Sequence, residues 1–338
     1  MQAVLMTEPG SPDVLQIQDI PAPTINKNNQ VLIRIYGAGV NPIDTKIRRR
    51  GTFYPEQMPA ILGCDGAGII EAIAPEVTQF KPGDEVYYCC GGLGQTGTGN
   101  YAQYAVVEEH YLALKPKTLS FVEAAAAPLV LITAWEALYD RGRLEAGQKV
   151  LIQAGAGGVG HVAIQLAKIK GAEVCTTVST PDKERLVRQL GADLPILYRQ
   201  KDVAKAAIAW TQRKGVDLAF DTVGGKILFD TIPAVKYGGD IVTLLEPDLS
   251  QGNFKLARKR NQRLSMELML TPMLERLVEG QKYHGQILRQ CAEWIDAGRL
   301  KIHLSRTFPL EQASKAHQAI ETGSSTGKIA LTVTATDD

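Results

Sequence analysis

Apolar residues follow two different patterns along the chain. Over residues 1–127 they form short alternating runs, such as 30–36, 68–73 and 84–88, separated by Gly and Pro. Short runs of alternating apolar and polar residues are typical of half-buried strands, and turn residues between them are typical of small barrels. We therefore predict an all-β, barrel-like domain in this part of the chain.

Between residues 128 and 272 β-type and helical patterns alternate. The apolar pattern predicts strands at 149–153, 173–178, 195–198, 216–221 and 240–245, and helices at 130–142, 159–171, 181–191, 202–213 and 226–235. This alternation predicts a doubly wound α/β fold, in which a parallel sheet is covered on both faces and ligands bind at the carboxyl ends of the strands.

The pattern changes again near residue 273. It predicts a helix over 285–298, then a strand, a second helix over 310–322 and a closing strand after Gly327. We assign this tail to the first domain, which then comprises residues 1–127 and 273–338, with residues 128–272 as the second domain.

The composition is that of an ordinary globular protein. Hydrophobic residues make up 45% and charged residues 22% of 338 residues, and the net charge is +1. This near-neutral balance argues against a nucleic-acid or membrane surface. Residues 1–8 are too few and too acidic for a signal peptide, and no apolar run reaches the roughly 20 residues that span a bilayer. We expect a cytoplasmic protein.

The cysteines are odd in number and irregularly spaced, and no CxxC pair occurs among Cys64, Cys89, Cys90, Cys175 and Cys291. We therefore expect reduced thiols, and a closed four-cysteine zinc site is excluded.

The most informative motif is a strand that leads into a glycine-rich turn and then a helix. Residues 150–152 are followed by Gly155-Ala156-Gly157-Gly158-Val159-Gly160. Gly155 is expected to allow a tight turn, Gly157 a close approach of the backbone to a pyrophosphate, and Gly160 close packing of helix on strand. The helix N-terminus then offers N–H groups to the phosphates, which predicts dinucleotide binding.

The end of the next predicted strand favours NADPH over NADH. Ser179 lies where NAD enzymes usually place an acid against the ribose 2′-hydroxyl, and Lys183 follows about one helical turn later. A hydroxyl and an ammonium can bind a 2′-phosphate that a carboxylate would repel. Alternatively, Ser179 is only the N-cap of the helix that begins near Pro181.

Several further motifs accompany the glycine turn, in this order: Gly39–Thr45, Gly63–Gly68, Phe80–Val86, Ala125–Pro128, Ala154–Gly160, Asp221–Gly225 and Gly327–Ile329. Together they resemble the medium-chain dehydrogenase/reductase superfamily, and within it the zinc-independent quinone oxidoreductase, or zeta-crystallin-like, branch. The resemblance covers nearly the whole chain. It implies a GroES-like β-barrel catalytic domain and a Rossmann cofactor domain.

The resemblance implies a set of catalytic residues near the substrate. Asn41 would face the nicotinamide and donate to the substrate oxygen, unless it is only a turn residue before Pro42. Asp44 would orient this loop or cap a helix. Lys46 would donate to the substrate carbonyl or be a surface lysine, and Tyr54 would line the acceptor pocket or be a buried aromatic.

The resemblance also implies contacts to the cofactor outside the glycine turn. Thr133 would contact the nicotinamide end, and the backbone of Leu244 and Leu245 the carboxamide. Tyr198 would pack near the 2′-phosphate, with a core position as its alternative, and Lys328 would approach the phosphates.

Zinc-dependent relatives bind catalytic zinc through a Cys, a His and a third ligand. Here Asn41 occupies the Cys position, Cys64 and Asp65 occupy the His-Glu pair, and the alanine-rich run before Pro128 lacks the third ligand. A catalytic zinc needs three protein ligands, so we expect no metal. Without a Lewis acid, the chemistry expected is hydride transfer from NADPH to a quinone or an α,β-unsaturated carbonyl.

Two alternatives remain open, an enoyl-thioester reductase and a non-catalytic, crystallin-like NADPH-binding protein. The basic cluster 258–263 is interpreted as a solvated loop or a phosphate contact rather than a nucleic-acid site. The resemblance implies a homodimer, paired through an edge strand at Leu264–Leu270.

Overall fold

The computed structural model describes residues 1–95, 97–323 and 325–334. The chain divides into two compact units. The first comprises Met1–Leu129, Leu270–Gly298 and the segment from Ile302 onward, and the second comprises Val130–Met269 and Arg299–Lys301. Each unit is described by itself. The boundaries expected at 127/128 and 272/273 stay a prediction.

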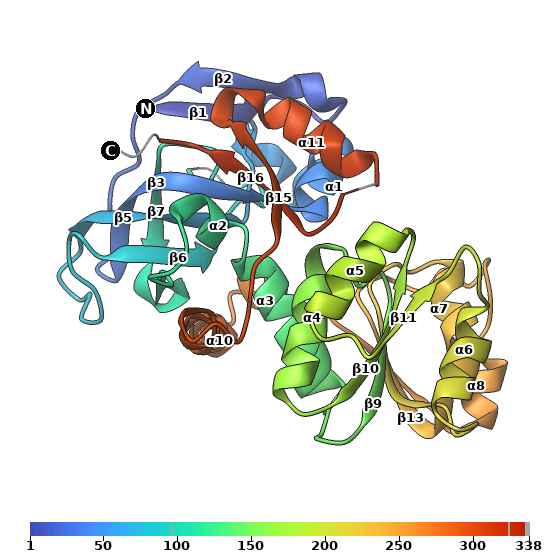
Figure 1. Ribbon diagram of the computed structural model, residues 1–338. Coiled ribbons are helices and arrows are strands. Elements are labelled where there is room, and N and C mark those ends of the chain that lie inside the picture. The colour runs from blue at the N-terminus through green and yellow to red at the C-terminus, as the bar shows by residue number, and fades with distance from the viewer. Residues whose placement is uncertain (96, 324, 335–338) are drawn as a thin grey trace. The chain divides into compact units, whose positions relative to one another are not determined.

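The first unit is built on β-sheet (Figure 1). A seven-stranded sheet has the order β15-β16-β3-β5-β6-β8, with β7 paired to β3, and a three-stranded sheet has the order β2-β1-β4. The strands are β1 (Gln2–Met6), β2 (Leu15–Asp19), β3 (Gln30–Val40), β4 (Ala60–Ile61), β5 (Asp65–Ile73), β6 (Glu85–Cys89), β7 (Tyr104–Glu108), β8 (Ala113–Leu114), β15 (Leu304–Pro309) and β16 (Lys328–Thr332).

Alternating apolar residues on β3, β5, β6 and β7 form one core. Val31, Ile33 and Ile35 of β3 point into it, with Ile70 of β5 and Val107 of β7. The last strand, β16, pairs with the carboxyl end of β3, with Ile329 opposite Val40. The tail predicted to return to the first domain therefore completes its sheet.

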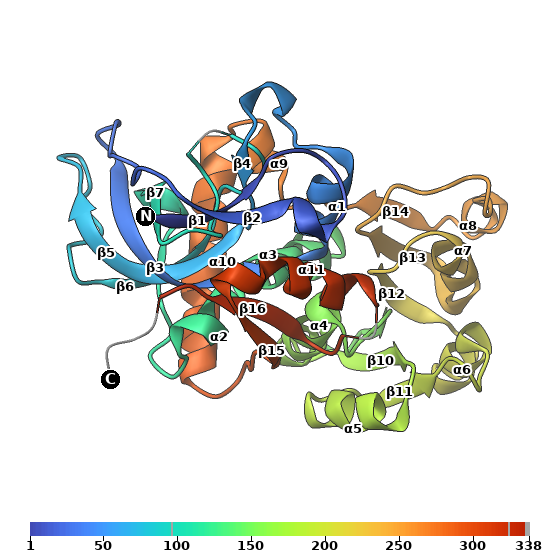
Figure 2. The ribbon, with the colours of Figure 1, turned by 90° about the horizontal axis from the view of Figure 1, so that it is seen from above.

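Short and long helices flank these sheets: α1 (Pro42–Arg50), α2 (Phe121–Ala125), α9 (Thr271–Leu274), α10 (Val278–Asp296) and α11 (Ala313–Glu321). Figure 2 shows α11 beside β16 and α10 as the longest helix of this unit. Two glycines of β3 let α2 pack on its backbone, since a Cβ on Gly37 would lie 2.8 Å from the Phe121 oxygen and one on Gly39 2.4 Å from the Ala125 oxygen.

The second unit is a six-stranded parallel sheet of order β11-β10-β9-β12-β13-β14. Its strands are β9 (Lys149–Ile152), β10 (Glu173–Val178), β11 (Leu194–Leu197), β12 (Val216–Asp221), β13 (Val235–Thr243) and β14 (Arg263–Met266). The central strands are nearly continuous apolar runs because helices cover both faces. Leu151, Cys175 and Ala219 lie in the resulting core.

Helices α4 (Gly158–Ile169) and α5 (Pro181–Gln189) cover one face of this sheet, and α6 (Val203–Trp210), α7 (Lys226–Thr231) and α8 (Lys255–Lys259) cover the other (Figure 1). The expected GroES-like and Rossmann architecture is confirmed, because right-handed crossovers on both sides of β9 produce this doubly wound order.

Several element boundaries differ from the sequence expectation. The helix expected at 130–142 is an α-helix, α3 (Pro128–Trp135), followed by a π-helical segment at Glu136–Arg141. Helix α10 begins at Val278 rather than 285. The edge strand expected at Leu264–Leu270 ends at Met266, because its partner strand β13 ends at Thr243, opposite Met266.

Candidate active site

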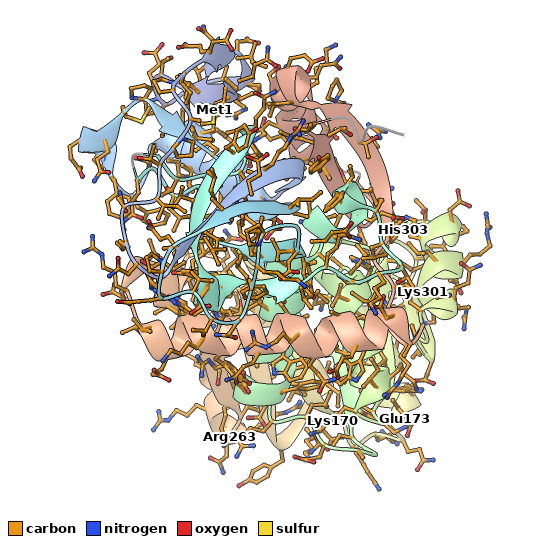
Figure 3. All side chains as sticks on the ribbon, turned by 90° about the vertical axis from the view of Figure 1, so that its left-hand side faces the viewer. Met1, Lys170, Glu173, Arg263, Lys301 and His303 are labelled. Atoms are coloured by element: carbon orange, nitrogen blue, oxygen red, sulfur yellow. The ribbon has the colours of Figure 1, made fainter. Side chains whose placement is uncertain are left out.

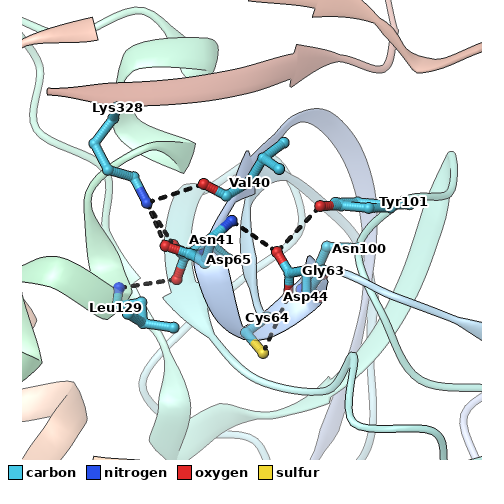
Figure 4. Close-up of polar contacts among 10 residues, drawn as sticks. All are labelled: Val40, Asn41, Asp44, Gly63, Cys64, Asp65, Asn100, Tyr101, Leu129 and Lys328. Atoms are coloured by element: carbon cyan, nitrogen blue, oxygen red, sulfur yellow. Dashed lines mark hydrogen bonds and ion pairs between the residues drawn. The ribbon is translucent and has the colours of Figure 1, made fainter. Parts of the chain in front are cut away.

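A buried polar cluster lies at the carboxyl end of β3 in the first unit. It comprises Asn41, Asp44, Asp65 and Lys328, which we call the Asn41 cluster (Figure 4). The amide nitrogen of Asn41 donates to Asp65 Oδ2 at 2.8 Å, and its oxygen accepts from the Lys328 ammonium. Both polar atoms of this side chain therefore have protein partners.

The start of α1 explains how Asn41 and Asp44 are placed. Asn41 is the N-cap residue, Pro42 follows at the first helical position, and the Asn41 N–H donates to Asp44 Oδ2 at 2.8 Å. This is the reciprocal arrangement of a capping box, with an acid at the third helical position. Asn41 is thus the cap and Asp44 its partner, which corrects the expectation that Asp44 caps the helix.

Asp65 joins the cluster from the first residue of β5. Its Oδ1 accepts from the Leu129 N–H at 2.8 Å, and its Oδ2 lies 3.9 Å from Lys328 Nζ. Lys328 also donates to the Val40 carbonyl at 3.4 Å. A buried lysine and a buried carboxylate are tolerable together because each supplies the charge that the other needs.

The cluster places two carboxyl groups and one ammonium away from water. The pKa of Asp44 is raised to about 7, mainly by burial; the hydrogen bond from the Asn41 N–H opposes the rise, and the neighbouring Asp65 charge adds to it. Burial also raises the pKa of Asp65, although Lys328 opposes this, and burial lowers the pKa of Lys328. With Asp44 protonated the cluster is neutral, and with Asp44 ionised it carries one negative charge.

Three further side chains contact Asp44 directly or through one another. Tyr101 donates to Asp44 Oδ2 at 3.1 Å, and its hydroxyl lies 3.1 Å from His317 Nε2. Cys64 Sγ lies 3.8 Å from Asp44 Oδ1, and burial raises the pKa of this thiol well above its usual value. Tyr101 and His317 were missed by the sequence analysis, because no local pattern relates either residue to Asp44.

Two predicted catalytic residues lie outside the cluster. Lys46 is exposed on α1, and Tyr54 is half-buried before a 3-10 turn at Pro55–Gln57. Lys328 was expected near the cofactor phosphates. Its ammonium is instead buried at 3% exposure among Val40, Asn41 and Asp65. This environment argues against a contact to the cofactor phosphates, because the Lys328 ammonium already has partners inside the first unit.

The glycine turn between β9 and α4 belongs to the second unit and is a candidate site for the cofactor. A Cβ on Gly155 would lie 2.0 Å from Thr176 Oγ1 of β10, and one on Gly160 would lie 2.3 Å from the Ala154 carbonyl oxygen. Gly160 thus permits the expected close packing. Ala154 enters the turn with a φ of 50°, and Gly155 must lack a side chain because of its contact with β10. Gly155 is also the second residue of the turn that the Gly157 N–H closes on the Ala154 carbonyl at 2.9 Å, which agrees with its expected place in a tight turn.

The turn leaves a cradle of the kind that a pyrophosphate requires. A Cβ on Gly157 would lie 3.1 Å from the Ala154 carbonyl oxygen, a tight contact but a milder one than those at Gly155 and Gly160, and no other atom of the surrounding chain lies within 4 Å. The His161 N–H is the first of α4 with a helical acceptor, at the Gly157 carbonyl. The N–H groups of Gly158, Val159 and Gly160 precede it, and Ala156 is buried beneath the turn.

The carboxyl end of β10 bears the residues expected to select the cofactor. Thr180, not Ser179, is the N-cap of α5, and its side chain accepts from the Lys183 N–H at 3.3 Å. The cap interpretation of Ser179 is therefore wrong. Tyr198 follows β11, is 48% exposed, and donates its N–H to the Val178 carbonyl at 3.2 Å. Its alternative as a core residue is also wrong.

Other predicted cofactor contacts have specific environments. Strand β13 ends at Thr243, so Leu244 and Leu245 follow the strand rather than end it. The Leu244 N–H donates to the Asp221 carbonyl, and the Leu245 N–H to Thr243 Oγ1. Thr133 is buried in the second half of α3 rather than at its start.

Part of the basic cluster supports the fold. Arg260 donates to the carbonyls of Pro233 and Val235, and Arg263 pairs with Asp240 Oδ2 at 2.5 Å. Charges of both signs reach the surface of this unit, as Lys170, Glu173 and Arg263 illustrate (Figure 3). Among the residues that the structure describes, no helix is long and apolar enough to cross a membrane.

Comparison with known proteins places the chain in a family. A family model described as an alcohol dehydrogenase GroES-like domain matches residues 27–117, and one described as a zinc-binding dehydrogenase matches residues 190–331. The chloroplastic NADPH-dependent alkenal/one oxidoreductase of Arabidopsis thaliana is 33% identical over 340 residues, covering 98% of this chain and 79% of the relative. The chain belongs to the medium-chain dehydrogenase/reductase superfamily.

Further similarities place it in the quinone oxidoreductase-like branch of this superfamily. A quinone oxidoreductase of Pongo abelii is 30% identical, covering 98% of this chain and 97% of the relative. A solved structure of an alcohol dehydrogenase superfamily protein from Novosphingobium aromaticivorans has a TM-score of 0.89 and 36% identity, covering 99% of this chain and 100% of that one. The expected resemblance is confirmed.

Many members of the superfamily bind zinc, but the residues here do not fit a zinc ion. The Lys328 ammonium occupies the space between Asn41 and Asp65 and would repel a second cation. No group of three or more His, Cys, Asp or Glu side chains suited to a metal occurs in the described part of the chain.

Proposed function

We propose that this protein is an NADPH-dependent reductase that transfers hydride to a quinone or an α,β-unsaturated carbonyl without a zinc ion. The observation that carries the proposal is the cradle of Gly155, Gly157 and Gly160 at the N-terminus of α4, in a chain 33% identical to an NADPH-dependent alkenal/one oxidoreductase. The superfamily fold and the quinone oxidoreductase relatives support the same chemistry.

The cofactor would be held by the second unit. We assign the pyrophosphate to the N–H groups at the start of α4, and the 2′-phosphate to Ser179, Lys183 and Tyr198 at the ends of β10 and β11. Thr133, Leu244 and Leu245 are proposed for the nicotinamide end. The bound nicotinamide supplies the hydride, and this chain's residues supply position and hydrogen bonds.

The Asn41 cluster is the part of the first unit that suits a developing oxyanion. Asn41 Nδ2 carries two hydrogens, and one of them is directed at Asp65. We propose that the second hydrogen stabilises the acceptor oxygen as hydride arrives, with Asp44 and Lys328 fixing the orientation of the amide. Contacts from Lys46 and Tyr54 to the acceptor stay predictions.

The test is oxidation of NADPH at 340 nm with purified protein and a panel of 1,2- and 1,4-quinones, enals, enones and crotonyl thioester. Turnover with quinones or enones that prefers NADPH and resists EDTA is expected. Preference for the thioester would select the enoyl-thioester reductase instead. Tight NADPH binding with no turnover on any acceptor would favour a non-catalytic, crystallin-like binder.

The edge of the second unit's sheet suits a homodimer. The edge strand β14 exposes apolar side chains at alternate positions: Leu264 is 38% and Met266 62% exposed, and Leu268, two residues after the strand, is 53% exposed. An apolar edge strand is a template for pairing with a second copy. We propose a homodimer joined there, and a cytoplasmic location, which the five unpaired cysteines support.

A further inference from the structure

A chain of hydrogen bonds leads away from the Asn41 cluster on the side of Asp44. Tyr101 donates to Asp44 Oδ2, and the same hydroxyl lies 3.1 Å from His317 Nε2. All three side chains are fully buried. The Tyr101 ring is fixed by Gly63, since a Cβ on Gly63 would lie 2.4 Å from the ring (Figure 4). The hydroxyl is therefore held between an acid and an imidazole.

The far end of this chain is marked by buried polar atoms without partners. His317 Nδ1, Arg48 Nε and Arg48 Nη1 have no hydrogen-bond partner, and they are three of the four such buried side-chain atoms in the described residues. Arg48 lies on α1 and His317 on α11, which pack against one another. An unpaired buried group costs about 1–3 kcal/mol, so something must satisfy these atoms.

The charges here favour water over an anion. Arg48 Nη2 is 2.6 Å from Glu321 Oε1, so the guanidinium already has a counter-ion. Burial, and next the Arg48 charge, lower the pKa of His317 to about 3, which keeps the imidazole neutral. A neutral imidazole has one nitrogen that donates and one that accepts, and it can therefore pass a proton from one side to the other.

The same three side chains can carry two opposite hydrogen-bond directions. When Asp44 is ionised, the Tyr101 O–H donates to it and His317 Nε2–H donates to Tyr101. When Asp44 is protonated, its O–H donates to Tyr101 and Tyr101 donates to Nε2, leaving the hydrogen on Nδ1. Conversion from the first state to the second adds one proton at His317 Nδ1 from outside the three side chains, while the Nε2 proton passes to Tyr101 and the Tyr101 proton passes to Asp44.

We propose that Arg48 and His317 hold an internal water, and that Tyr101 and His317 relay protons between this water and Asp44. The relay lets the buried Asp44 exchange its proton, so that the charge of the Asn41 cluster can follow the pH of the solution. When Asp44 takes up a proton, an O–H bond forms on Asp44 as one breaks on Tyr101, Tyr101 regains a proton from Nε2, and Nδ1 takes one from the water. The water regains its proton from the solvent, so that it is unchanged at the end, and release of the Asp44 proton runs through the same steps in reverse.

The relay has a consequence for the reaction, and this part rests on the proposed reductase function. Hydride transfer places negative charge beside Asn41, which a neutral cluster tolerates and a negative one opposes. The titratable groups around Asp44 are Asp65 on β5, Lys328 on β16, Cys64 just before β5, and Tyr101. The charged group that acts on His317 is Arg48. Tyr101 and His317 are therefore positioning residues that act through Asp44.

The first test needs neither cofactor nor turnover. We would follow the carboxylic acid C=O band of Asp44 by infrared spectroscopy after a pH jump, assigning the band with Asp44→Asn. Wild type should show rapid protonation, and Tyr101→Phe and His317→Gln should slow it at least tenfold. Tyr104→Phe, which removes the hydroxyl of a half-buried tyrosine that bonds Glu71, is the matched control. An unchanged rate in Tyr101→Phe, or no titrating band from Asp44, would overturn the relay.

The second test separates the relay from the proposed function. In wild type kcat should fall above about pH 7, and Asp44→Asn should flatten this fall. The hydrogen bond from Tyr101 lowers the pKa of Asp44, so Tyr101→Phe should raise that pKa and move the fall in kcat to higher pH. A wild type inactive on all acceptors refutes the function, while the infrared result still decides the relay. A crystal structure without water within hydrogen-bond distance of His317 Nδ1 would refute the water site.

Discussion

The Lys328 ammonium donates to the side-chain oxygen of Asn41, a residue 287 positions earlier in the chain. The contact joins β16 to the N-cap of α1 and fixes the Asn41 amide, while Asp65 accepts from the other atom of that amide at 2.8 Å. One hydrogen bond thus connects the last strand of the first unit with the residue proposed to contact the acceptor.

Removing the Lys328 charge should destabilise the first unit. Lys328→Met leaves Asp65 without its counter-ion and Asn41 Oδ1 without its donor, and we expect a loss of about 3–5 kcal/mol in the free energy of unfolding, measured in urea. Lys328→Met with Asp65→Asn should lose less than the sum of the single changes. Lys315→Met, at an exposed position of α11, should change little. Additive losses would show that the pair does not interact.

The stability contributed by Asp44 should decrease as pH rises. Because its pKa is raised from 3.8 to about 7 in the folded state, the folded protein binds more protons than the unfolded chain between these values. The difference in unfolding free energy between wild type and Asp44→Asn should therefore fall from about pH 4 to pH 7, by at most about 1.4 kcal/mol per pH unit. Denaturant unfolding at several pH values measures this difference. A constant difference would contradict the buried acid.

The three glycines of the turn should respond differently to alanine. In Gly155→Ala and Gly160→Ala the new methyl group meets Thr176 Oγ1 or the Ala154 carbonyl, so both variants should lose stability by roughly 1–3 kcal/mol. Gly157→Ala, whose methyl group would lie 3.1 Å from the Ala154 carbonyl oxygen, should lose less stability than either of these variants and weaken NADPH binding at least tenfold in calorimetry. Normal NADPH affinity in Gly157→Ala would place the pyrophosphate elsewhere.

Cofactor preference should depend on the end of β10. Ser179→Asp places a carboxylate where the 2′-phosphate is proposed, and KM for NADPH should rise at least tenfold while KM for NADH stays nearly constant. Gln189→Glu, on the exposed end of α5, adds the same charge away from this position and should have little effect. Equal changes for both cofactors would remove Ser179 from the 2′-phosphate site.

The proposed dimer should dissociate when its edge strand is charged. Met266→Lys introduces an ammonium at the most exposed apolar position of β14, and light scattering should then report a monomer at micromolar concentration. Leu277→Lys changes an exposed leucine of the first unit and should leave the oligomeric state unaltered. A wild-type monomer would refute the proposal, as would a dimer retained in Met266→Lys.

The amino-acid sequence by itself determined the architecture and the place of the dinucleotide turn. Three local patterns carried these predictions: the period-two apolar runs, the alternation of strands and helices, and Gly155-x-Gly157-x-x-Gly160. Each depends on residues close together in the chain, and the structure contains the elements that they predict. Some ends of elements were wrong, as at α10 and β14, since packing against neighbours decides where a helix or strand stops.

Only the tertiary structure decided which polar groups meet. Lys328 was expected near the cofactor phosphates, but its ammonium donates to the side-chain oxygen of Asn41. His317 belonged to no motif, and its imidazole contacts the Tyr101 hydroxyl. These pairs are hundreds of residues apart, so no periodic pattern relates them. Burial then determines their chemistry: away from water a charge must find its partner inside the protein, and the sheet that brings β16 beside β3 determines which partner that is.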